Sequence, residues 1–193
     1  MRPFWRQEQI EDLALITLLD FRRRTGLPLA PPIDVDLVGE IACGLSWDWD
    51  VLPEPPGTKV WAGLYPRERL VVLNETHRDT FVAKSGLERF TKAHEIGHWI
   101  LHVRDGFYHY SAPQEYCFVG EYTTAAPRDH WLERHADWFA AALLMPANLF
   151  VPAAEECDLS DWKGLYRLAA TFDVTITALT VRLQQLGFAI VSK

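Results

Sequence analysis

The residues of this chain most able to do chemistry are five consecutive ones, His94-Glu95-Ile96-Gly97-His98. Two histidines four residues apart lie on the same face of a helix, so both imidazoles can reach one metal ion. Glu95 lies beside that face, where its carboxylate can take a proton from a metal-bound water molecule. This HExxH pattern is typical of zinc peptidases, and it predicts His94 and His98 as metal ligands and Glu95 as the general base.

A catalytic zinc ion needs a third protein ligand and keeps one position open for water. His102 follows His98 by four residues and lies eight residues from His94. Eight residues of helix rise about 12 Å, a distance that ligand bonds of about 2 Å cannot span. We therefore interpret His102 as a packing residue or a support for the ligands, and expect the third ligand from a separate element.

The favoured third ligand is Glu133, in a second helix-forming segment. Glu133 and Asp137 are four residues apart, so Asp137 can accept a hydrogen bond from a ligating imidazole and fix its tautomer. An apolar stripe at helical spacing, which would dock this segment on the core, consists of Leu132, Ala136, Phe139 and Leu143. The alternatives for the third ligand are His135, His130 and Asp129.

Hydrophobic periodicity around these residues predicts a mixed α+β fold. Helices are expected over residues 5–24, 36–43, 86–103 and 127–145, and as a pair over 161–186. Two short strands are expected over 59–64 and 69–74. Ser85 and Glu88 have the spacing of a capping box, which predicts where the HExxH helix begins.

The segment between the two motif helices, residues 106–126, has no helical period and is predicted to be a long loop, a feature that is often functional. Peptide hydrolysis needs a donor for the developing oxyanion. The candidates in or near this loop, among which the sequence does not choose, are Tyr108, His109, Tyr110, Tyr116, Tyr122 and His130. Cys117 in the same loop could act as a thiolate ligand of an inhibited zinc, although buried free cysteine is the commoner role.

Composition excludes several other classes of protein. The 193 residues carry a formal net charge of −7, which disfavours a nucleic-acid surface because phosphate binding needs clustered Lys and Arg. The three cysteines form no CxxC pair and favour a reducing compartment. No run approaches the ~18 apolar residues of a membrane span, so we expect a cytoplasmic protein.

The last third of the chain loosely resembles a helix-turn-helix over residues 168–182. A DNA-reading helix usually presents several basic or amide side chains to the groove. Residues 175–186 offer only Arg182, Gln184 and Gln185. We therefore expect these helices to pack on the core or dock a partner, and DNA binding is disfavoured.

Two stretches together resemble the ImmA/IrrE family of metallopeptidases (the DUF955 group). The first is Arg89-Phe90-Thr91-Lys92-Ala93 leading into the HExxH motif, and the second runs from Glu133-Arg134-His135-Ala136-Asp137 to Leu143-Leu144-Met145-Pro146. The strand predicted over 69–74 also fits, and the resemblance covers roughly residues 35–190. Lys92 departs from the family, which usually has an apolar residue there.

The resemblance implies a compact, gluzincin-like zincin core with a small, mostly antiparallel sheet, an HExxH helix and a glutamate-bearing helix. We expect this core, with an N-terminal helix, over residues 1–157, and a helical extension packed on it over 158–193. The implied function is a Zn²⁺-dependent endopeptidase that cleaves a helix-turn-helix (Xre-type) repressor or similar partner in phage or mobile-element regulation. The alternative is a zincin-fold binding module of a toxin–antitoxin or phage-defence system, against which the intact Glu95 argues.

Overall fold

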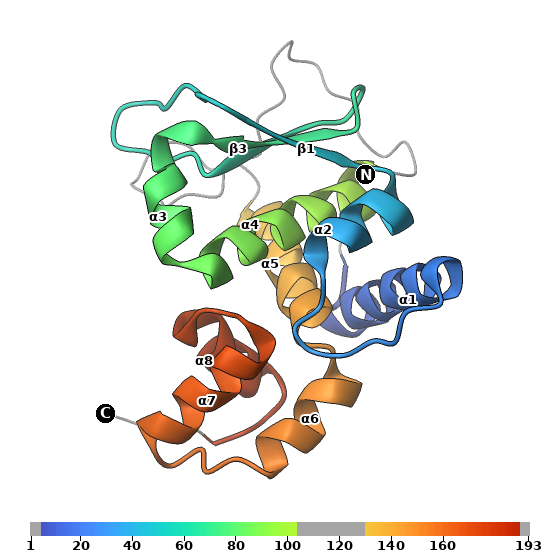
Figure 1. The fold of residues 1–193 in the computed structure, drawn as a ribbon, viewed down its shortest axis with the longest axis vertical. Helices are drawn as coiled ribbons and strands as arrows, with labels where there is room; N and C mark the ends of the chain where they lie inside the picture. Colours follow the sequence, from blue (N-terminus) through green and yellow to red (C-terminus); the bar gives the residue numbers. More distant parts are fainter. Residues whose placement is uncertain (1–4, 104–129, 190–193) are drawn as a thin grey trace.

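The computed structural model describes residues 5–103 and 130–189, which form a mixed α+β fold (Figure 1). The α-helices are α1 (Gln7–Thr25), α2 (Val35–Leu37), α3 (Arg78–Ala83), α4 (Ser85–His98), α5 (His130–Leu144), α6 (Ala147–Glu155), α7 (Trp162–Phe172) and α8 (Ile176–Gln185). Two π-helical segments, η1 (Val38–Cys43) and η3 (Trp99–Val103), extend α2 and α4, and a short 3₁₀ turn is η2 (Glu75–His77). The strands are β1 (Ser46–Asp50), β2 (Ala62–Tyr65) and β3 (Leu70–Asn74). The predicted fold class is confirmed.

The sheet has the order β1–β3–β2 and is mixed. β2 and β3 are antiparallel and are joined by a tight turn, whereas β1 pairs with β3 in parallel, with Ser46 opposite Leu70. The expectation of a mostly antiparallel sheet was therefore wrong for one of the two pairings. Parallel neighbours need a crossover connection. Between β1 and its parallel neighbour β3, the chain passes through residues 51–61 and then through β2.

Strand β1 was not predicted, although its sequence Ser-Trp-Asp-Trp-Asp alternates. Trp47 and Trp49 are partly buried, while the serine and both aspartates between and beside them are exposed. The Trp47 indole donates a hydrogen bond to the carbonyl oxygen of Asp36 at 3.3 Å, and the Trp49 ring meets that of Phe81 edge to face. The alternation of aromatic and acidic residues with a period of two was the pattern from which this strand could have been predicted.

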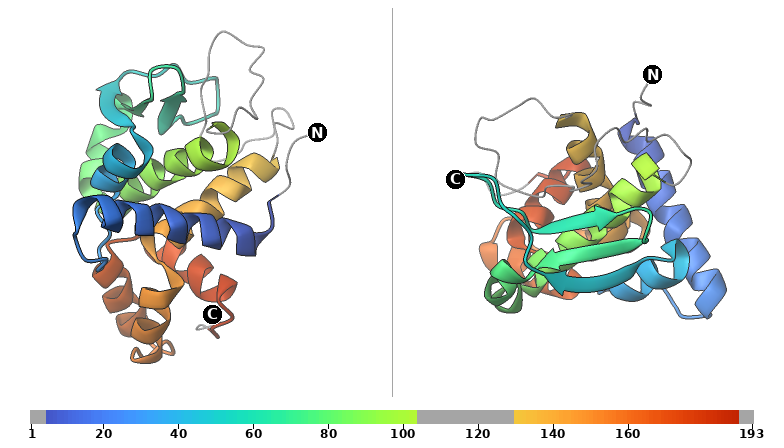
Figure 2. Two further views of the ribbon diagram at one scale, coloured as in Figure 1. Left: turned by 90° about the vertical axis from the view of Figure 1, so that its right-hand side faces the viewer. Right: turned by 90° about the horizontal axis from the view of Figure 1, so that it is seen from above.

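Helix α4 forms the centre of the molecule. The sheet lies along one side of it, α5 packs against it, and α1 packs on α5 (Figures 1 and 2). One continuous apolar core includes side chains from α1, α4, α5, α7 and α8. Helix α4 begins at Ser85, close to the predicted start, but Ser85 does not cap it, because its hydroxyl donates to Oδ1 of Asp173 at 2.7 Å.

The two C-terminal helices are confirmed as α7 and α8, and their attachment depends on Arg182. This side chain is fully buried, donates from Nε to the carbonyl of Met145 at 3.0 Å, and forms a two-pronged ion pair with Glu11 of α1. The one basic side chain of α8 is thus committed to internal contacts. The proposed division of the chain at residues 157 and 158 stays a prediction.

Pro146 ends α5, as expected, but it also serves as the N-cap of the unpredicted helix α6.

Within residues 5–103 and 130–189, no single helix is long and apolar enough to cross a membrane. Residues Trp131–Leu144 of α5 and helix α6 have the length and apolar composition of a membrane span only when they are taken together, and the two helices are bent by 66° relative to each other.

Candidate metal centre

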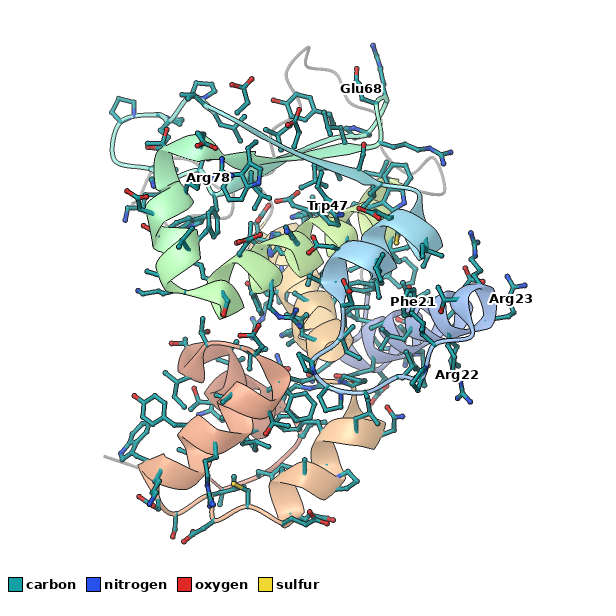
Figure 3. All side chains as sticks on the ribbon, viewed as in Figure 1. Phe21, Arg22, Arg23, Trp47, Glu68 and Arg78 are labelled. Carbon is teal, nitrogen blue, oxygen red and sulfur yellow. The ribbon has the colours of Figure 1, made fainter. Side chains whose placement is uncertain are left out.

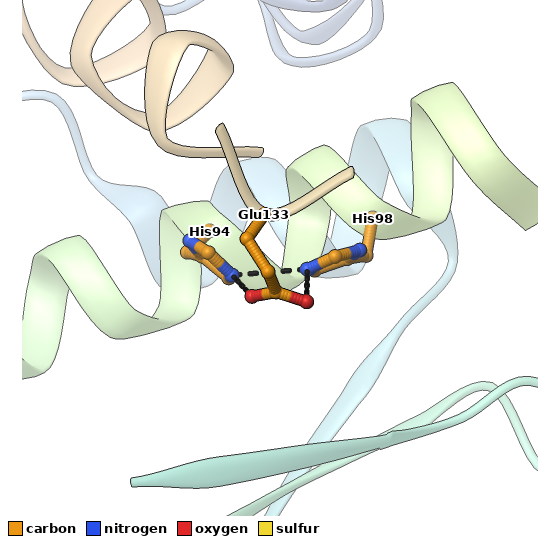
Figure 4. Close-up of side chains that lie close together, drawn as sticks. All are labelled: His94, His98 and Glu133. Atoms are coloured by element: carbon orange, nitrogen blue, oxygen red, sulfur yellow. Dashed lines mark hydrogen bonds and ion pairs between the residues drawn. The ribbon is translucent and has the colours of Figure 1, made fainter. Parts of the chain in front are cut away.

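Three side chains from two helices converge on one point (Figure 4). Nε2 of His94 lies 2.9 Å from Nε2 of His98 and 3.3 Å from Oε2 of Glu133, and Nε2 of His98 lies 3.6 Å from Oε1 of Glu133. In a tetrahedral shell with bonds of about 2.0–2.1 Å, donor atoms are about 3.3 Å apart. The three donors therefore have the spacing that one metal ion requires.

Helix geometry places the two histidines, and Gly97 lets the second helix approach. A Cβ at position 97 would lie 3.1 Å from the Cα and carbonyl oxygen of Ala136 and 3.2 Å from Cβ of Phe139. Because α4 and α5 touch at backbone distance there, Glu133, which lies about one turn before Ala136 on α5, reaches across to the imidazoles. The motif glycine thus sets the distance between the two ligand-bearing helices.

Each of the two imidazoles has a hydrogen-bond partner at the ring nitrogen that faces away from Glu133. Nδ1 of His94 lies 2.9 Å from Oδ1 of Asp137, so the carboxylate accepts the Nδ1 proton and leaves the Nε2 lone pair for a metal. Nδ1 of His98 lies 3.0 Å from Nδ1 of His102. We assign the shared proton to His98, because its Nε2 must then be free of hydrogen to act as a ligand.

The charges around this point favour a cation. Burial lowers the pKa of His94, but its hydrogen bonds to Asp137 and Glu133 outweigh burial and raise that pKa to about 10. Burial raises the pKa of Glu133, but His98 and His94 outweigh it and hold that pKa far below its usual range. Burial keeps His98 neutral by lowering its pKa. In the metal-free protein the positive charge of protonated His94 thus takes the role that the charge of a bound metal would have.

Glu95 is the polar member of the motif for which the described part of the chain offers no hydrogen-bond partner. Its side chain is fully buried, and neither carboxylate oxygen has a hydrogen-bond partner among the described residues. Burial, with a smaller contribution from Glu133, raises the pKa of Glu95 to about 8, against the opposing effect of His94. An orphaned buried carboxylate beside two imidazoles fits a site built for a metal ion and a water molecule.

Comparison with protein families places this site in a known group. The model of the IrrE N-terminal-like domain (peptidase M78) matches residues 59–184, about two thirds of the chain. The chain belongs to this M78 family. The match contains α4 and α5 with His94, His98 and Glu133 and confirms the resemblance to ImmA/IrrE, while α1 and β1 precede it. No curated protein matches the chain.

Lys92, at the position where the resemblance implies an apolar residue, has a structural explanation. Its ammonium group lies 2.7 Å from Oδ1 of Asp36 and 2.7 Å from Oε1 of Glu88, and 5.6 Å from the centre of the Trp47 ring. Burial lowers the pKa of Lys92, but the two carboxylates outweigh this and raise it. The lysine therefore ties α2 and β1 to α4, on the side where Trp47 is labelled in Figure 3.

Of the alternatives for the third ligand in this M78 chain, the structure describes the side chain of His135. His135 is buried on α5, with its ring 6.1 Å from that of His102 and 6.0 Å from that of Trp138. Among the described residues, only His94, His98 and Glu133 form a group able to hold a metal. Asp129, the side chain of His130, Cys117 and the oxyanion candidates of the loop lie outside the described residues.

Proposed function

We propose that this protein is a zinc-dependent endopeptidase in which His94, His98 and Glu133 hold the metal and Glu95 is the general base. The observation that carries the proposal is the convergence of the three donor atoms beside the unpartnered carboxylate of Glu95. Two imidazoles and one glutamate are a known donor set of catalytic zinc. Bound zinc would polarise the scissile carbonyl and make the attacking water more acidic.

The residues of the chain supply the proton chemistry and the geometry. The Glu95 side chain is buried beside the two imidazoles, so in its ionised form it can take a proton from a metal-bound water molecule and later deliver it to the leaving amine. Asp137 and His102 hold the two imidazoles in the tautomer that presents Nε2 to the metal. These partners keep the ligand geometry fixed through the reaction.

The substrate class we propose is a helix-turn-helix transcriptional regulator, and it rests on the family resemblance. Incubation of the purified protein with the regulator encoded beside its gene, followed by mass spectrometry of fragments, tests it directly. Cleavage at one bond that stops with a chelator and resumes with added zinc supports the proposal. Intact regulator in all zinc-loaded samples contradicts this substrate class.

The roles of the site residues are separated by two variants. Glu95→Gln should keep stoichiometric zinc by elemental analysis and lose cleavage, because an amide cannot act as a base. Glu133→Ala should lose both zinc and cleavage, while the surface change Glu75→Gln, on a carboxylate paired with Arg78, should alter neither. Full cleavage by Glu95→Gln would refute the general-base assignment.

The same experiment tests the alternative function. A binding module would hold zinc and form a stable complex with the regulator, yet leave its peptide bonds intact in wild type and Glu95→Gln alike. The endopeptidase proposal requires the two proteins to differ.

A further inference from the structure

Helix α1 has apolar side chains on two opposite faces. Its inner face, which includes Ile10, Ala14, Leu18 and Phe21, is buried against the rest of the molecule, including α5 and η1. On its outer face Leu15, Ile16 and Leu19 are 37%, 59% and 46% exposed. A surface helix of a monomer is ordinarily polar on this side. In Figure 2 (left) α1 lies across the outside of the molecule, with its outer face uncovered by the other helices.

Charged residues flank this apolar patch in a fixed order. Glu8 and Asp12 lie toward the start of α1 and Arg22 toward its end, and with Leu15 and Leu19 they follow one seam of alternating four- and three-residue steps. Arg22 projects away from the body of the molecule in Figure 3. The helix dipole accounts for acids before bases, but not for the exposed apolar residues between them.

The flanking charges are available for an outside partner. Among the described residues, no ion pair includes Glu8, Asp12 or Arg22, whereas the next residue, Arg23, is paired with Asp20 at 2.7 Å. A seam with an acidic end, an apolar middle and a basic end is complementary to itself when one copy is reversed.

We propose that the outer face of α1 binds a second copy of this chain, helix against helix and antiparallel about a two-fold axis. The register that sets Leu15 opposite Leu19 of the second copy also sets Asp12 opposite its Arg22, because both pairs are centred on the same point of the helix. Two-fold symmetry repeats every contact twice. A parallel arrangement would instead bring like charges together.

The expected contact is weak, because stable dimers bury roughly 800 Å² on each partner and a single helix seam buries less. Dissociation at micromolar concentrations follows from this size. The contact is independent of the proposed peptidase activity, since the inner face of α1, and not its outer face, packs on α5.

Sedimentation velocity of the full chain, from about 5 μM to about 500 μM, tests the proposal. The dimer fraction of the wild type should rise across this series, and Leu19→Glu should remain monomeric throughout. Val82→Glu is the matched control, because Val82 is 78% exposed on α3, away from the seam, and should leave the dimer unchanged. Circular dichroism confirms that each variant is folded.

A charge exchange distinguishes the proposed register from nonspecific hydrophobic association. Asp12→Arg and Arg22→Asp, taken singly, should each weaken the dimer roughly tenfold, because two ion pairs become two repulsions. The double variant exchanges the charges and should return to within about threefold of wild type. A wild type that is monomeric at the highest concentration, a dimer insensitive to Leu19→Glu, or a double variant no tighter than the singles would each overturn the proposal.

Discussion

His98 and His102 face each other through their Nδ1 atoms at 3.0 Å, so the second candidate ligand is oriented by another histidine. Burial, with the neighbouring His98 and His135, lowers the pKa of His102 to about 2, and its ring is therefore neutral and able to accept a hydrogen bond. This pair is the counterpart of the His94–Asp137 pair, in which the acceptor is a carboxylate. His102 is consequently a positioning residue in the proposed metal site.

Replacing His102 tests this role by metal affinity. His102→Leu should weaken zinc binding about 10- to 100-fold, because His98 loses the partner that fixes its tautomer. His102→Asn should retain most of the affinity, since its Oδ1 can accept where Nδ1 does now. Competition with a chromophoric chelator measures both. Equal affinity in the leucine and asparagine variants would reduce His102 to a packing residue.

Gly97→Ala should weaken the site without removing a ligand. Alanine favours a helix by up to about 1 kcal/mol over glycine, but overpacking costs about 1–3 kcal/mol. The added methyl would meet the backbone of Ala136 at 3.1 Å, so overpacking should dominate and push α5 outward. We expect a lower melting temperature of the metal-free protein and a roughly tenfold loss of zinc affinity, since Glu133 moves with α5. A higher melting temperature with unchanged affinity would contradict this account of the helix contact.

The stability of the metal-free protein should fall as pH rises from about 7 to about 8.5. His94 has its pKa raised from 6.5 to about 10, so the stability it contributes is complete below pH 6.5 and is lost toward pH 10. Glu95, raised from 4.5 to about 8, acts in the same direction between those values. The lowered pKa values of Glu133 and His98 cause losses only at acidic pH, so they leave this interval unchanged.

Zinc should reverse this trend. Metal binding displaces the proton from His94, so affinity increases with pH. The rise in melting temperature on adding zinc should therefore grow across the same interval, which differential scanning fluorimetry with and without a chelator measures. A zinc-induced rise that shrinks toward pH 8.5 would show that His94 is not protonated in the metal-free protein.

Removal of Glu11 and removal of Arg182 should lower the free energy of unfolding by different amounts. Glu11→Leu leaves a fully buried guanidinium without its counter-ion and should lower the free energy of unfolding by about 3–5 kcal/mol. Arg182→Met should cost less, because the Glu11 side chain is 26% exposed and can be hydrated. The double variant should be more stable than Glu11→Leu alone, as urea unfolding can determine. If Arg182→Met is the more damaging change, the buried charge is not the dominant effect.

Long-range contacts account for most of the features that the sequence did not predict. Ser85 has the spacing of a capping residue, yet its hydroxyl donates to Asp173, which follows α7. Strand β1 combines a polar face with two tryptophans that pack on different helices, so its pattern was weaker than that of β3. In each instance the decisive partner lies far along the chain and leaves no local pattern.

The sequence by itself determined the local half of the proposed metal site: four-residue spacing on a helix places His94 and His98 on one face, with Glu95 beside that face. The same rule paired Glu133 with Asp137. Only the tertiary structure decided between Glu133 and His135, the two candidate third ligands whose side chains it describes. The contact of α5 with α4 at Gly97 points Glu133 at the two imidazoles and turns His135 toward Trp138. Helical periodicity is fixed by backbone geometry within a few residues, whereas the rotation of one helix against another depends on packing between distant segments.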